Sequence, residues 1–169
     1  MAGVTLLEVM LMVALATPLC GLLTARWEQL VRRSRTSEAT SNVASLFRGA
    51  VAYYEPDHHW GGKPKQFPAS VGPTPRLEAV TAARGKRIVE PAGGWDDPSW
   101  QALSFAMGEP HHYAYQFISS GIATQSEFTA RALGDLDGDG IFSTFERQSS
   151  ADANNTARPR PFTVTDPLQ

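Results

Sequence analysis

The segment 135–146 has residue types and spacing that suit the binding of a divalent cation. It reads DLDGDGIFSTFE, with carboxylates at alternate positions at its start, a glycine after the third of them and a glutamate at its end. This is the spacing of the calcium loop of an EF-hand, in which the glycine makes a sharp turn. The sequence therefore predicts calcium ligands from Asp135, Asp137, Asp139, Ile141 (through its carbonyl oxygen), Ser143 and Glu146.

A hairpin turn rich in Asp and Gly is the alternative interpretation of this segment. The residues on both sides alternate as strands do, whereas a true EF-hand has helices there. In a hairpin, Glu146 would lie too far along its strand to reach the ion. Both interpretations stay open, and calcium is the one cofactor that the sequence suggests.

The histidines come in two adjacent pairs, His58–His59 and His111–His112. Zinc binding would need further ligands, and no cysteine lies near either pair to complete a tetrahedron. We therefore expect these histidines to lie on the surface. No nucleophile motif, phosphate-binding loop or paired catalytic carboxylates occur in the sequence, so an enzyme is not expected. The single cysteine, Cys20, excludes an intrachain disulfide bond.

The composition is that of a globular protein of about one domain, with 169 residues, 42% of them hydrophobic and 19% charged. A net charge of −2 gives no basic surface for nucleic acid. The charges are unevenly distributed, because Glu8 is the only charged residue among the first 25. An apolar stem is therefore joined to a polar head.

Helical periodicity runs through the first third of the chain. Residues 4–23 form an apolar run of a length that would span a bilayer as a helix of about 30 Å. Farther along, one apolar stripe at helical spacing consists of Ala39, Val43, Leu46, Phe47, Ala50, Val51 and Tyr54. The pattern predicts one helix from about residue 3 to residue 54. Within its first half Glu8 is an anomaly, since carboxylates are costly inside a membrane.

The beginning of the chain resembles a known family. Gly3-Val4-Thr5-Leu6-Leu7-Glu8 is similar to the signature of type IV pilins and pseudopilins, which prepilin peptidase cleaves after the glycine. A second stretch, RSRTSEA at 33–39 followed by Asn42-Val43, resembles the start of the exposed half of the pilin helix. The two matches lie in the family's own register. The resemblance covers about the first 54 residues closely and the rest only in layout.

The resemblance implies a fold, a processing step and a function. The expected fold class is α+β and pilin-like, with a long N-terminal helix whose first half is transmembrane, packed on a small antiparallel β-sheet. Cleavage between Gly3 and Val4 would create an amine on Val4, which is usually N-methylated in this family. Glu8 would pair with that amine on a neighbouring subunit during assembly. The chain would then be a structural subunit of a type IV pilus-like filament or of a type II secretion pseudopilus.

The implied partners are the prepilin peptidase, other pilin or pseudopilin subunits and an inner-membrane assembly platform. The implied location is the bacterial inner membrane, as a single-pass protein, before assembly, and a periplasmic or extracellular filament afterwards. The alternative is a single-pass membrane protein that does not polymerise and carries a calcium-dependent binding head. Nucleic acid is not an expected partner.

Six segments follow from these patterns. They are a leader (1–3), a filament-core half helix (4–25), an amphipathic half helix (26–54), a loop-rich connection (55–110), an antiparallel sheet (111–148) and a polar tail (149–169). Strands are expected at 112–119, 127–133 and 141–147, with an edge strand at 162–164. A short helical turn is expected at Pro98, capped by Asp96 or Asp97. The apolar residues around this turn, from Trp95 to Met107, are expected to pack on the sheet.

Overall fold

The computed structural model of the chain describes residues 5–55 and 64–166. The chain divides into two compact units, residues 1–35 and residues 36–169. Helix α1 (Leu6–Tyr54) begins in the first unit and ends in the second.

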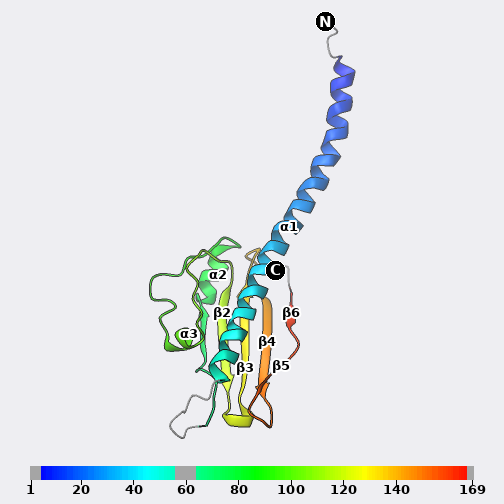
Figure 1. Ribbon diagram of the computed structural model, residues 1–169. Helices are drawn as coiled ribbons and strands as arrows, with labels where there is room; N and C mark the ends of the chain where they lie inside the picture. Colours follow the sequence, from blue (N-terminus) through cyan, green and yellow to red (C-terminus); the bar gives the residue numbers. More distant parts are fainter. Residues whose placement is uncertain (1–4, 56–63, 167–169) are drawn as a thin grey trace. The chain divides into compact units, whose positions relative to one another are not determined.

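The second unit is mostly an antiparallel sheet of six strands (Figure 1). The strands are β1 (Val71–Thr74), β2 (Ala114–Ser120), β3 (Glu127–Gly134), β4 (Ser143–Ala151), β5 (Ala157–Pro159) and β6 (Thr163–Thr165). Their order in the sheet is β1-β2-β3-β4-β5, and β6 also pairs with β4. Short helices α2 (Leu77–Ala83) and α3 (Pro98–Ala102) and a 3₁₀ turn (Ala123–Gln125) complete the unit.

The central strands β2, β3 and β4 form the antiparallel meander that the alternation predicted. Phe117 of β2 lies opposite Ala130 of β3, and Ala132 of β3 lies opposite Phe145 of β4. These four side chains are fully buried on the same face. The expected edge strand is also present as β6, although it begins at Thr163. The meander therefore supplies one apolar face and one polar face.

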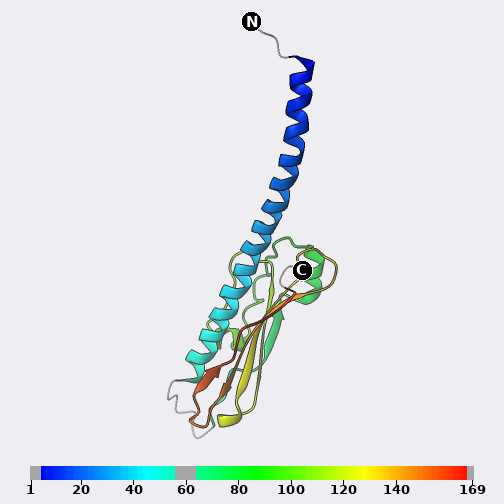
Figure 2. The ribbon, with the colours of Figure 1, turned by 90° about the vertical axis from the view of Figure 1, so that its right-hand side faces the viewer.

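The residues of α1 from Thr36 onward pack on the apolar face of the sheet (Figure 2). Six members of the predicted apolar stripe are buried, and Val51 is partly buried. The rings of Phe47 and Phe128 lie 5.4 Å apart, and the Tyr54 hydroxyl donates a hydrogen bond to the Ala123 carbonyl at 3.0 Å. Burial of this face is the main source of stability for the second unit.

The predicted helical turn at Pro98 is α3. Asp97 is its N-cap and accepts a hydrogen bond from the Ser99 amide at 2.8 Å, which satisfies one of the unpaired amides at the start of the helix. Trp100, Leu103 and Phe105 are buried in the core, as expected. The stretch that we expected to be loop-rich also contains β1 and α2.

The expected fold class is wrong in its membrane-spanning half. Within residues 5–55 and 64–166, no helix has both the length and the apolarity that crossing a bilayer requires. Glu8, an exposed and ionisable carboxylate, lies in the first turn of α1, and carboxylates are costly inside a membrane. Helix α1 is therefore not the apolar transmembrane helix that the sequence led us to expect.

Candidate functional site

Of the residues assigned to processing and assembly, Gly3 and Val4 lie outside the described residues. Glu8 is described, and it lies in the first turn of α1. Its Oε2 accepts hydrogen bonds from the amide and from the hydroxyl of Thr5, both at 2.9 Å. In return, the Glu8 amide donates to the Thr5 hydroxyl at 3.3 Å. This reciprocal arrangement is a capping box, and it fixes the start of the helix.

The capping box also sets the electrostatics of Glu8. The hydrogen bonds from the Thr5 backbone and side chain lower the pKa of Glu8, and they outweigh a small effect of burial. The carboxylate is therefore ionised at neutral pH. Both Thr5 hydrogen bonds use Oε2, which leaves Oε1 directed to no group among the described residues. Glu8 can thus cap its own helix and still offer an oxygen to a cation. The T-x-x-E spacing of Thr5 and Glu8 is the signal for this capping box in the sequence.

The first unit exposes large apolar side chains along α1. Leu6 is 79% exposed, and Met10, Met12 and Leu30 are each more than 60% exposed. Exposed apolar side chains of this size gain free energy when another molecule covers them. The described side chains of this unit therefore combine an apolar surface with a single carboxylate at its start.

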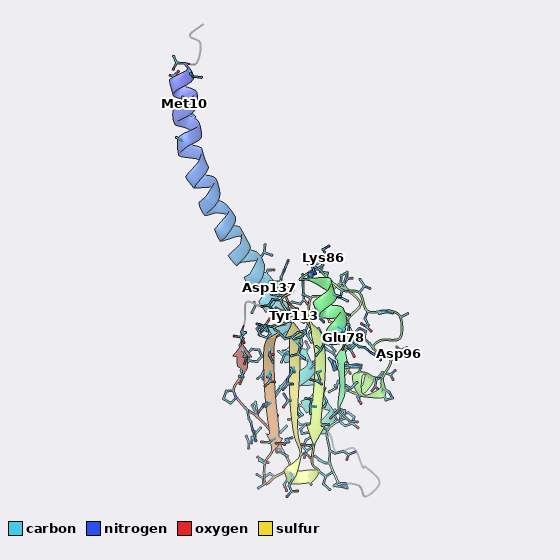
Figure 3. The ribbon with its side chains drawn as sticks, turned by 180° about the vertical axis from the view of Figure 1, so that it is seen from behind. Met10, Glu78, Lys86, Asp96, Tyr113 and Asp137 are labelled. Carbon is cyan, nitrogen blue, oxygen red and sulfur yellow. The ribbon has the colours of Figure 1, made fainter. Side chains whose placement is uncertain are left out.

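The acidic segment between β3 and β4 folds as a tight turn, which Figure 3 shows at Asp137. Asp135 is buried and accepts hydrogen bonds from the amides of Gly138 at 2.7 Å and Gly140 at 3.1 Å. Asp139 accepts a hydrogen bond from the Ile141 amide at 2.7 Å. These hydrogen bonds hold the backbone in a tight turn. The turn brings the aspartate side chains close to one another.

Three of the six predicted calcium ligands come together in this turn. One carboxylate oxygen from each of Asp135, Asp137 and Asp139 lies within 4.8 Å of the others, and such a group could hold a metal ion. Asp137 and Asp139 are exposed, so an ion could reach them from solvent. Oxygen ligands of this kind suit calcium.

Two of the other predicted ligands, Ser143 and Glu146, bond to other groups. The Ser143 hydroxyl is buried and donates to the Gly134 carbonyl at 3.2 Å. Glu146 forms an ion pair with Arg131, its partner across the β3–β4 ladder. The reason is the strand β4, which begins at Ser143 and carries the chain away from the turn at the extended rise of a strand. Ile141 precedes this strand, and its amide is used by Asp139.

Two of the histidines form part of the core, contrary to our expectation of surface histidines. His111 is 1% exposed and His112 is 8% exposed, whereas His58 and His59 lie outside the described residues. The Glu38 carboxylate of α1 accepts two hydrogen bonds from His112, one from its amide and one from its Nδ1, both at 2.8 Å. A carboxylate on the helix thus clamps the residue that leads into β2.

The electrostatics of Glu38 follow from this clamp. Burial opposes the charge of the carboxylate, but the hydrogen bonds from His112 outweigh burial and lower the pKa of Glu38. One turn along α1, the Asn42 amide donates to the Tyr115 hydroxyl at 2.7 Å. Burial raises the pKa of Tyr115, so its hydroxyl stays neutral. These polar contacts fix how α1 lies on the sheet within the second unit, and they show no arrangement of a nucleophile and a base.

Comparison with known proteins gave no match to any family model, curated protein or solved structure. The resemblance of the first residues to the pilin signature accordingly stays a prediction.

Proposed function

We propose that the chain is a structural subunit of a filament, either a type IV pilus-like fibre or a type II secretion pseudopilus. Prepilin peptidase would cleave it between Gly3 and Val4, and subunits would then assemble through the N-terminal part of α1. The proposal is supported by the signature from Gly3 to Glu8 and by the second match, in register, at residues 33–39.

The observation that carries the proposal is the apolar surface of α1 in the first unit. Leu6, Met10 and Met12 are exposed on the part of α1 that lies in the first unit. Side chains of this size gain free energy when they leave water. Packing the stems of several copies against one another would bury them. A filament core made of such stems is the assembly that this surface fits.

Glu8 would set the register of that assembly. Its ionised carboxylate has one oxygen held by Thr5 and one available for the Val4 amine of a neighbouring subunit. Between packed apolar stems, the attraction between these charges is strong and an unpaired carboxylate is unfavourable. A subunit that adds out of register would leave Glu8 unpaired. Glu8 would thus contribute specificity, with no catalytic role.

The partners in this proposal are the prepilin peptidase, other subunits of the same filament and an assembly platform in the bacterial inner membrane. The assembled product would be a periplasmic or extracellular filament. The described residues contain no nucleotide-binding loop, so a separate ATPase would supply the energy for assembly.

A second candidate function rests on the turn between β3 and β4. The convergence of Asp135, Asp137 and Asp139 favours a head that binds calcium and, through it, another molecule, without forming a filament. Calcium would offset the repulsion among the three carboxylates. The filament proposal requires the Glu8 carboxylate, whereas a calcium-binding head does not. A substitution of Glu8 therefore distinguishes the two functions.

The experiment replaces Glu8 with glutamine. Glutamine keeps an oxygen that can accept the hydrogen bonds of Thr5, so the capping box survives while the charge is lost. We expect the Glu8→Gln chain to fold normally by circular dichroism and to be excluded from filaments in a host that assembles the wild type. Glu78→Gln, which removes an exposed carboxylate from α2, is the matched control. Incorporation of Glu8→Gln at the wild-type level would contradict the proposed pairing.

A further inference from the structure

A groove runs along one flank of α1 in the second unit, between the helix and the segment that leads from β5 to β6. Ala44 of α1, Arg147 of β4 and the segment 160–162 line this α1–β6 groove, whose cavity volume is about 650 Å³. The helix packs on the central strands, and β6 lies at the edge of the sheet beyond β4 (Figure 1). The groove therefore occupies the part of the inner sheet face that α1 leaves uncovered.

The groove combines positive charge with apolar surface. The guanidinium carbon of Arg147 lies 4.2 Å from the centroid of the Phe47 ring, which orients this side chain at the edge of the core. Arg160 is exposed, and its amide donates to the Gln148 carbonyl at 2.8 Å, which holds the backbone there. Phe162 is 38% exposed beside it. The described lining residues include no carboxylate, so a partner would have to supply the negative charge.

The turn after β3 carries the complementary chemistry on the same head. Asp137 and Asp139 are exposed carboxylates, and Ile141, two residues farther on, is 52% exposed. Hydrogen bonds from the backbone hold this segment, which we call the acidic turn (137–141), in one conformation. A fixed segment loses little conformational entropy on binding. It offers two negative charges and one large apolar side chain, which match the two arginines and Phe162 of the groove.

We propose that the α1–β6 groove binds the acidic turn of a second copy of this chain. The carboxylates of Asp137 and Asp139 would pair with Arg147 and Arg160, since guanidinium groups bind carboxylates with two parallel hydrogen bonds. Ile141 would pack against Phe162. The contact joins two different surfaces of the head, and contacts of this kind build rings or open helical arrays rather than closed twofold dimers.

This inference rests on the proposed function, because a filament holds neighbouring heads close together. The stems would place each head at a high effective concentration beside the next, so a weak contact between heads suffices. The stems would supply the affinity, and the heads would supply the spacing and orientation along the filament.

The test is a photo-cross-link between full-length chains. One chain is labelled with ¹⁵N and carries p-benzoylphenylalanine in place of Phe162, while the other is unlabelled and otherwise wild type. The two are mixed at about 1 mM, so that even a contact with a millimolar dissociation constant is about half occupied. We expect cross-links from the labelled chain to segment 137–141 of the unlabelled chain by mass spectrometry. The mixed isotopes distinguish these products from links within one chain.

Charge exchange supplies the second readout. We expect Arg160→Glu in the labelled chain to lower the yield about tenfold, since it turns attraction into repulsion. Pairing it with Asp137→Arg in the unlabelled chain should restore the yield to within about twofold of wild type. Arg76→Glu, the same charge change at the exposed start of α2, is the control and should leave the yield unchanged.

Three results would overturn the inference. They are a lack of mixed-isotope products, mixed products that map outside the acidic turn, and a failure of the charge exchange to restore the yield. None of these depends on peptidase cleavage. The head contact can therefore fail while the filament proposal stands, and a chain that is never cleaved at Gly3–Val4 would remove the filament proposal while leaving the cross-link result intact.

Discussion

The hydrogen-bonded clamp between Glu38 and His112 should contribute measurably to the stability of the second unit. The carboxylate accepts two hydrogen bonds of 2.8 Å from a residue 74 positions away, and His112 is almost fully buried. Hydrogen bonds to charged groups contribute about 1.5–3 kcal/mol each. Glu38 is 22% exposed, so water would replace part of what is lost. We therefore expect Glu38→Ala to cost about 3 kcal/mol, at the lower end of that range for two bonds.

Glu38→Gln separates the charge from the hydrogen bonds. The amide oxygen can still accept from the His112 amide, and the other histidine tautomer can accept from the glutamine nitrogen. Both bonds then survive without the assistance of charge, which about halves their strength. We expect a loss of about 1.5 kcal/mol for Glu38→Gln at pH 7, which is half of the value for the two charged bonds. Glu78→Gln on α2 is the control and should change stability by less than about 0.5 kcal/mol.

The dependence on pH gives a sharper signature of the same clamp. The pKa of Glu38 is lowered in the folded chain, so its contribution is complete above the ordinary value of 4.5. It is lost as the pH falls from that value through the lowered pKa, because protonation then favours the unfolded chain. The wild type should lose this increment in acid, whereas Glu38→Gln should not.

The assay is urea unfolding, followed by tryptophan fluorescence, at pH 7 and at a series of values below 4.5. Trp95 and Trp100 lie in or against the core of the second unit, so their emission reports its unfolding. Equal stabilities for Glu38→Ala and wild type at pH 7 would refute the reasoning. Parallel acid profiles for wild type and Glu38→Gln would refute its electrostatic part.

Three further predictions concern close packing, helix capping and metal binding. Gly49→Ala should lower stability by about 1–3 kcal/mol in the same assay, because a Cβ there would lie 2.0 Å from the Leu103 carbonyl oxygen; an unchanged midpoint would contradict this. Asp97→Ala should cost about 1 kcal/mol through the lost N-cap of α3, and a rise in the melting temperature would count against it. Calcium should raise the melting temperature with a dissociation constant of about 10⁻⁴–10⁻³ M, and a chain carrying both Asp137→Asn and Asp139→Asn should show no rise; equal shifts in both would disprove the ion site.

The sequence predicted the parts of the fold that depend on the local spacing of apolar residues. The apolar stripe from Ala39 to Tyr54 identified the buried face of α1, because its spacing follows the helical period. Period-two alternation located β2 and β3 to within two residues at each end. Strand β4 begins two residues later than expected, since Asp139 holds the Ile141 amide in the preceding turn.

The parts that the sequence did not predict depend on residues far apart in the chain. Glu38 and His112 carry no local signal that they meet, and the burial of His112 follows from the packing of α1 on the sheet. The calcium ligands show the same limit. Asp135 and its neighbours converge through local turns, whereas the position of Glu146 depends on where β4 begins and which strand it pairs with. The prediction that the first half of α1 spans a membrane rests on composition and a resemblance, and this part of the predicted fold is wrong.

The central claim is that the chain is a processed filament subunit, and its N-terminus tests this most directly. The full chain would be expressed with and without a prepilin peptidase, and its N-terminal sequence and intact mass would be determined. The account predicts a peptidase-dependent cut between Gly3 and Val4, with an added methyl group on the new amine. A chain that still begins at Met1 in the presence of an active peptidase would contradict it, and the acidic turn between β3 and β4 would then be the place to look for function.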